Sequence, residues 1–99
     1  MAFAGIHIAC GMNLMFDRLA KPVWSRSLAT AGTTNRAAAE GQDVWEITAS
    51  ADSFVAIGPT PDASQAEGEG ASARILLRAG ERRSFQARPG DRVAWVPVP

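Results

Sequence analysis

The second half of the chain consists of short apolar stretches separated by tight turns and one polar loop. It reads ITASADSFVAIGPTPDAS, then ASARILLRAGERRSF, then QARPGDRVAWVPV. Apolar and polar residues that alternate over a few positions are typical of a β-strand with one buried face. Turn residues at spacings of about ten positions are typical of antiparallel sandwiches and small barrels. The pattern predicts an all-β domain that packs and binds, rather than one built around an active site.

Individual strands follow from the apolar residues that recur at every second position. VWEITAS and FVAIG form two such stretches, joined at a turn around Asp52. AGER is expected to turn the chain again, and Gly90 supplies the positive φ that a type II turn needs after Pro89. We expect one face of each strand to be buried, with inward residues Ile6, Ile8, Cys10, Trp45, Ile47, Ala49, Ile75, Leu77, Phe85, Val93 and Trp95.

The remaining segments carry weaker patterns. LMF at 14–16 and PVWSRSL at 22–28 each fit a short strand, with Pro22 at a strand start or on an edge, and FDRLAK alternatively fits one helical turn. Residues 29–42 are small and polar and predict a loop or extended arm, with a brief helical turn at 37–40 as an option. TPDASQAEGEGAS has no large apolar residue, which predicts a mobile surface loop. Pro97 and Pro99 are expected to stop further strand pairing.

These segments predict one domain over residues 1–99, a small antiparallel β-sandwich or barrel with an irregular N-terminal arm. Residues 1–42 would hold the N-terminal strand and the arm, and residues 43–99 the main antiparallel strands. A chain of 99 residues buries only about 60–70% of the surface that it exposes when unfolded. Because only 7% of its residues are aromatic, large core side chains are scarce, which favours a homo-oligomer.

Charges are segregated along the chain although the formal net charge is zero. Residues 37–73 contain seven acids and no lysine or arginine, and two acids and six arginines follow, namely Arg74, Arg78, Arg82, Arg83, Arg88 and Arg92. One surface is therefore expected to be acidic and another basic, as contacts between subunits would use. The simpler alternative is that the two strips neutralise each other within the monomer.

Sequence motifs for catalysis and cofactor binding are missing. His7 stands in an apolar alternation, no serine lies in a GxSxG motif, and no spacing of His, Cys or acids is that of a metal site. We predict no enzymatic activity and no cofactor. Neutral overall charge argues against nucleic acid as a partner, although Phe85 among arginines offers a stacking surface. The N-terminal segment is neither a Sec signal nor a membrane span, and Cys10 has no partner for an intrachain disulfide.

One stretch resembles a known family. EITASADSFVAIGPTPDAS, followed by a polar loop and LLRAGERRSFQARPGDRVAWV, resembles small β-sandwich virion structural proteins of tailed bacteriophages, such as capsid decoration (cement) or head-associated proteins. The resemblance covers about residues 44–96. It implies a non-enzymatic protein, made in the host cytoplasm and located in the virion. Such a protein binds and stabilises the shell of the major capsid protein, often as a trimer.

Candidate interface residues follow from the arm, one tryptophan and the arginines of a predicted hairpin. They are Trp24, Arg36, Arg82, Arg83 and Arg88. Arginine and tryptophan are the side chains most often found at the energetic centre of protein interfaces. Two other classes stay open. One is a phage neck or tail component or a carbohydrate-binding module, with the loop at 60–72 facing outward; the other is a small cellular enzyme or regulator that depends on His7.

Overall fold

The computed structural model describes residues 3–13 and 19–99. Over these residues the chain forms eight strands and one short 3-10 helix. In chain order they are β1 (Ile6–Asn13), β2 (Leu19–Leu28), β3 (Gly32–Thr33), β4 (Val44–Ala49), β5 (Ser53–Gly58), η1 (Gly70–Ser72), β6 (Arg74–Leu77), β7 (Arg82–Gln86) and β8 (Arg92–Pro97).

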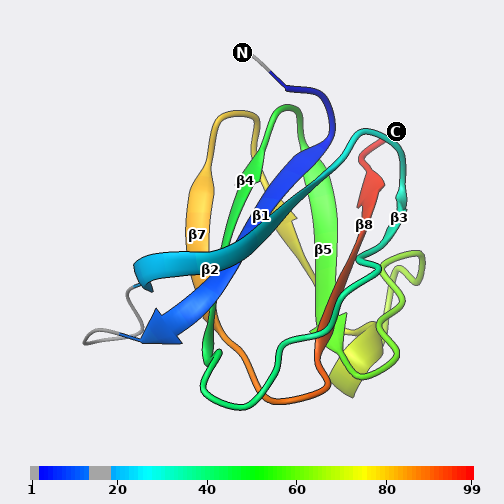
Figure 1. Cartoon of the computed structure of the whole chain (residues 1–99). Helices are drawn as coiled ribbons and strands as arrows, with labels where there is room; N and C mark the ends of the chain where they lie inside the picture. Colours follow the sequence, from blue (N-terminus) through cyan, green and yellow to red (C-terminus); the bar gives the residue numbers. More distant parts are fainter. Residues whose placement is uncertain (1–2, 14–18) are drawn as a thin grey trace.

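The strands form two four-stranded sheets that face each other (Figure 1). Sheet A has the order β2-β1-β4-β7, and sheet B has the order β3-β8-β5-β6. Every neighbouring pair is antiparallel. The prediction of an all-β, antiparallel sandwich is therefore confirmed.

The strand order is that of a rolled ribbon. Strand β5 pairs with β6, β4 with β7 and β3 with β8, and these pairs lie alternately in sheets B, A and B. A two-stranded antiparallel ribbon wound up in this way gives the eight-stranded double sheet of a jelly roll. The pair β1 and β2 completes sheet A, with β1 next to β4. The loop between β5 and β6 is thus the tip of the ribbon.

Most turns carry the chain from one sheet to the other. The turn around Asp52 joins β4 in sheet A to β5 in sheet B, and AGER joins β6 in sheet B to β7 in sheet A. The expected hairpin around the arginines is therefore wrong, because β6 and β7 are not hydrogen-bonded to each other. The turn after Pro89 is as expected, since Gly90 has φ of 92°.

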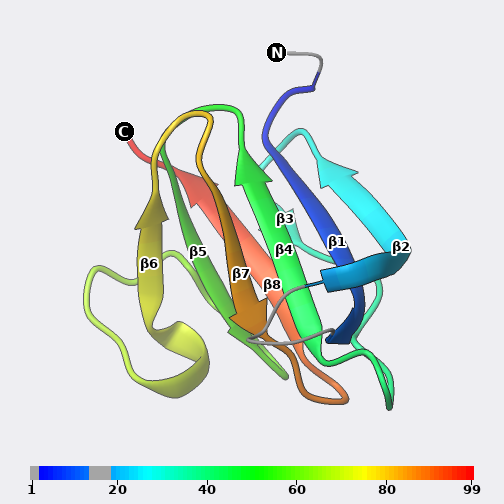
Figure 2. The same cartoon turned by 90° about the vertical axis from the view of Figure 1, so that its left-hand side faces the viewer.

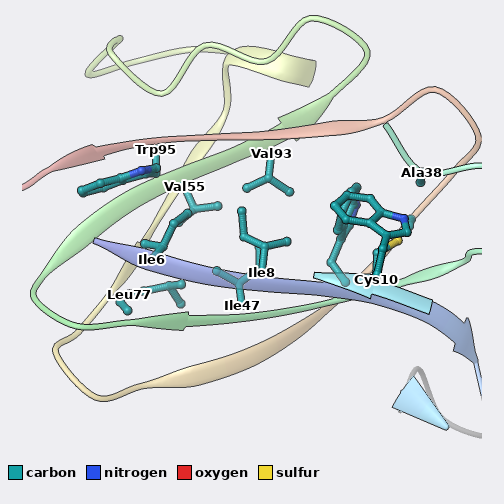
Figure 3. Packing of buried hydrophobic residues seen from close by; sticks show 13 residues of the cluster. Ile6, Ile8, Cys10, Ala38, Ile47, Val55, Leu77, Val93 and Trp95 are labelled. Atoms are coloured by element: carbon teal, nitrogen blue, oxygen red, sulfur yellow. The ribbon is translucent and has the colours of Figure 1, made fainter. Parts of the chain in front are cut away.

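The core lies between the sheets and follows the predicted alternation (Figure 3). Nine of the eleven predicted inward residues are buried: Ile6, Ile8, Cys10, Trp45, Ile47, Ala49, Leu77, Val93 and Trp95. Ile75 and Phe85 differ. Ile75 keeps 37% of its surface exposed, and Phe85 is only partly buried against the cluster.

The arm at residues 29–42 is folded into the domain. It contains β3, and beyond β3 the amide of Thr34 donates to the Val93 carbonyl at 2.8 Å. Ala38, which is buried, donates to the Asp91 carbonyl and accepts from the Gly90 amide, both at 2.8 Å. The expected arm is thus packed against the domain, because buried backbone groups need partners and these are provided by β8 and its turn. The optional helical turn at 37–40 does not form.

Strand β2 is longer than expected and is an edge strand of sheet A. It includes the predicted stretch 22–28, and Pro22 sits opposite Gly11 where the register of β1 and β2 shifts. Proline tolerates such an irregular edge position because it has no amide to donate. Residues 19–21 of FDRLAK belong to β2. Residues 16–18 of that stretch and the expected strand at 14–16 lie outside the described residues.

The loop at residues 60–72 is mostly exposed but contains one buried residue. Ala63 is buried and packs with Ala56 and Ala94 on the outer face of sheet B. Asp62 forms a turn next to Ala63, in which its carboxylate accepts hydrogen bonds from the amide and the hydroxyl of Ser64 at 2.9 and 2.6 Å. These bonds lower the pKa of Asp62 below its usual range. The loop is thus at the surface, as expected, and the one residue that is buried in it has a small side chain.

Cys10 gives a pH-dependent test of the core. Burial raises the pKa of its thiol from 9.0 to about 11. The unfolded chain therefore loses this proton near pH 9 while the folded chain keeps it, so stability falls as pH rises from 9 towards 11. We expect the free energy of unfolding of the native protein to drop by about 2–3 kcal/mol more than that of Cys10→Val over this range. Urea unfolding at several pH values measures it, and identical pH profiles for the two proteins would contradict the burial of this thiol.

Candidate functional site

The five residues predicted at an interface lie in three places. Trp24 is on β2, and Arg36 lies above its ring at 5.1 Å from the ring centre. Arg82 and Arg83 are on β7, which is the opposite edge of sheet A. Arg88 belongs to the turn between β7 and β8. One contact surface cannot include the β2 group and the β7 group unless it spans the whole sheet.

Trp24 belongs to the core. It is 6% exposed, and its ring meets that of Trp45 edge-on, with centroids 5.5 Å apart and planes at 87°. Its Nε1 donates to Oε1 of Gln42 at 2.9 Å. The expectation that the Trp24 ring is available to a partner is therefore wrong. Arg36, which lies over this ring, is exposed at the surface instead. The burial of Trp24 could not be predicted from local sequence, because the contacts with Arg36 and Gln42 come from residues 29–42.

The side of the sandwich formed by β6 and β7 is open. Strand β7 is the last strand of sheet A and β6 is the last strand of sheet B, and Figure 2 shows both on the side facing the viewer. No other described strand pairs with the outer edge of either one. A sheet edge of this kind carries unpaired N–H and C=O groups that another chain can bind.

The hydrogen bonds at both ends of β7 show which of its backbone groups are free. The Ala87 amide donates to the Asp43 carbonyl at 2.8 Å, and the Glu81 carbonyl accepts from Ala49 at 3.1 Å. Bonds to one neighbour recur at every second residue of an antiparallel ladder, so Phe85 and Arg83 also bond to β4. The N–H and C=O groups of the intervening residues, Arg82, Ser84 and Gln86, therefore point away from β4 to the open edge.

An apolar groove of about 260 Å³ lies between the two edges, and its lining is Val55, Ile57, Ala73, Arg74, Ile75 and Phe85. It explains why two predicted core residues are half exposed. Ile75 and Phe85 do face inward, but their strands do not pair, so the core reaches the surface between them. Leu76, on the other face of β6, is 36% exposed. Apolar side chains that stay exposed at a strand edge indicate a contact site.

Arginines surround this opening. Residues 82–88 contain three arginines and no acid. Arg82 lies 3.4 Å from Glu46 on the outer face of sheet A, and Arg83 lies 3.0 Å from Glu81, yet their side chains remain 69% and 42% exposed. The pKa of Glu81 is lowered, first by the bond from the Arg78 amide and then by Arg83. These exposed pairs are worth little in stability, so the guanidinium groups are available to a partner.

The neighbouring arginine of β6 is already engaged. The Arg74 guanidinium lies 3.6 Å from the centre of the Phe54 ring and donates to the Ala63 carbonyl at 3.1 Å. The Glu46–Arg82 pair joins the acidic and basic strips within one monomer. For this pair, the alternative that the two strips neutralise each other within the monomer holds. It does not hold for the whole basic strip.

His7 lies on the outer face of sheet A, away from the groove. Its Nδ1 is 2.8 Å from the Ser27 hydroxyl, and the Phe3 ring is 6.1 Å away. The part of the chain that the structure describes contains no group of three or more His, Cys, Asp or Glu residues that could hold a metal. Within the same residues, no helix is long and apolar enough to cross a membrane.

Comparison with known proteins gives no relative. No family model matches the chain, and neither a curated protein nor a solved structure shows significant similarity to it.

Proposed function

We propose that the protein is a non-enzymatic virion structural protein of a tailed bacteriophage. It decorates the capsid, binding the shell of the major capsid protein and stabilising it. It is made in the host cytoplasm and acts in the virion as a homo-oligomer, with a trimer favoured by the family that its sequence resembles. Neither nucleic acid nor a membrane is a partner in this proposal.

The observation that carries the proposal is the open side of the sandwich, where two unpaired strand edges flank an apolar groove with arginines around it. A groove of this size, between two edges, suits an extended protein segment better than a small ligand. Sheet edges and grooves of this kind serve association, which is the task of a subunit that attaches to a shell.

The fold adds support by analogy. Jelly rolls occur in viral capsid proteins, and they also occur in lectins and in cupins. Fold alone does not define function, so this likeness only favours a virion role among others. It is consistent with the sequence resemblance over residues 44–96.

The alternatives receive less support. A carbohydrate-binding module usually stacks sugars on exposed aromatic rings, whereas Trp24, Trp45 and Trp95 are all at least 94% buried. A small enzyme dependent on His7 would need a cleft at that residue, and His7 does not line the groove beside β6 and β7. A neck or tail component differs from a decoration protein only in its position and copy number.

Quantitative mass spectrometry of purified particles tests the proposal. The copy number of this protein is expected to be comparable with that of the major capsid protein, because a decoration protein covers the whole shell. A few copies per particle would move the protein to the neck or tail. Its absence from particles would overturn the virion assignment.

A further inference from the structure

We propose that the open edge of β7 binds an extended partner segment as a fifth strand of sheet A, and that acidic and apolar residues alternate in this segment. The inference deepens the proposed function and rests on it only in taking the segment to come from the capsid protein. The binding mode and the residue pattern follow from this chain.

The backbone of β7 sets the mode of binding. Three consecutive outward-facing positions, Arg82, Ser84 and Gln86, offer N–H and C=O groups that do not bond to β4. Their side chains are exposed. A strand that pairs along this edge satisfies all of these groups at once, as in other cases of strand addition.

The two faces of β7 set the side-chain pattern. Phe85 faces inward onto the groove, next to Ile75. Side chains of an added strand that lie beside Phe85 would therefore enter apolar surroundings, whereas the next inward-facing position would lie beside Arg83, which is on the same face of β7. The other side chains would lie beside Arg82 on the outer face of sheet A, where the guanidinium is 69% exposed. Carboxylates match that position, and arginine binds them with two hydrogen bonds.

The chain's own acidic loop does not have this pattern. Residues 64–70 read SQAEGEG and contain no large apolar residue to enter the groove. A second copy of this protein is therefore a poorer occupant than a separate partner with alternating residues. Self-association through this edge would show in the oligomeric state, as described below.

Ser84→Pro tests the backbone part of the proposal. Proline removes the free amide at the middle of β7, and the bonds from β7 to β4 are kept because they belong to Phe85 and Arg83. Ser84→Ala is the matched control, since it retains the amide. In co-sedimentation with purified shells that lack this protein, Ser84→Pro is expected to bind at least about tenfold more weakly than Ser84→Ala. Circular dichroism and thermal unfolding check that both variants are folded.

Arg82→Glu tests the charge part of the proposal. Its affinity for shells is expected to fall by about tenfold, whereas Lys21→Glu, the same charge change on the opposite edge strand β2, leaves binding unchanged. A short synthetic peptide of alternating glutamate and valine provides a probe that does not depend on shells. It is expected to shift the amide NMR signals of residues 82–86 and not those of β2, and a peptide with lysine in place of glutamate should not.

The outcomes separate the two proposals. If the native protein binds shells and both β7 variants bind equally well, strand addition is overturned and the decoration role stands. If the native protein does not bind shells but the glutamate peptide binds at β7, the decoration role fails and the strand-addition site stands. If Ser84→Pro changes only the oligomeric state in analytical ultracentrifugation, the occupant is a second copy and the separate partner is excluded.

Discussion

Replacing Trp45 with alanine is expected to lower the free energy of unfolding by about 3–5 kcal/mol. Trp45 is the largest side chain that is completely buried, and it packs edge-on against Trp24. A domain of 99 residues has a total stability of roughly 5–15 kcal/mol. The loss is therefore a large part of the total, and in a protein at the low end of this range most molecules would unfold.

Urea unfolding followed by circular dichroism measures this change. Val23→Ala is the control, because Val23 lies on β2 but is 52% exposed, and its truncation is expected to change stability by about 0.5 kcal/mol or less. Trp45→Phe should lose less than Trp45→Ala, since it keeps an aromatic ring and removes an indole N–H that has no acceptor among the described residues. A loss below about 1 kcal/mol for Trp45→Ala would contradict the central position of this side chain.

The second large effect is expected at Gly5, where the chain enters β1. Gly5 has φ of 74°, and a Cβ atom on it would overlap the carbonyl oxygen of Leu28. The obstacle is backbone of β2, which cannot move without disturbing its pairing with β1. We expect Gly5→Ala to cost on the order of 3–5 kcal/mol.

Gly80→Ala separates the steric conflict from the backbone strain. Gly80 has a similar φ of 81°, but nothing lies within 4 Å of an added Cβ. Its substitution should cost only the left-handed conformation, about 1–2 kcal/mol. Equal losses for the two variants in urea unfolding would show that the close approach of Gly5 to β2 is not present in solution.

The sequence predicts the faces of the strands well and their partners poorly. Alternation is a local property, so the inward positions of Ile8, Ile47 and Val93 could be assigned without knowing what they face. Pairing between strands far apart in the chain leaves no local trace. For this reason the contact of the arm with β8, and the cover that it gives Trp24, could not be foreseen.

The sequence predicts only part of the candidate site, because the site also depends on which strands pair. Arg82 and Arg83 were singled out for their residue type, and the structure places both on an edge strand. The groove was missed because Ile75 and Phe85 have the pattern of ordinary core residues, and only the separation of β6 from β7 leaves them half exposed. One available signal was the short polar stretch RRSFQ, since charged residues within a short strand are typical of a sheet edge.

The position of β8 also has a consequence for how the protein is made. This strand follows the other described strands in the sequence, yet it lies inside sheet B and pairs with both β3 and β5. Sheet B therefore cannot close until residues 92–97 have been synthesised and have left the ribosome. Until then β3 lacks its neighbour and one edge of β5 has no partner. Because these pairs join strands that are far apart in the sequence, we expect the protein to fold slowly for its size.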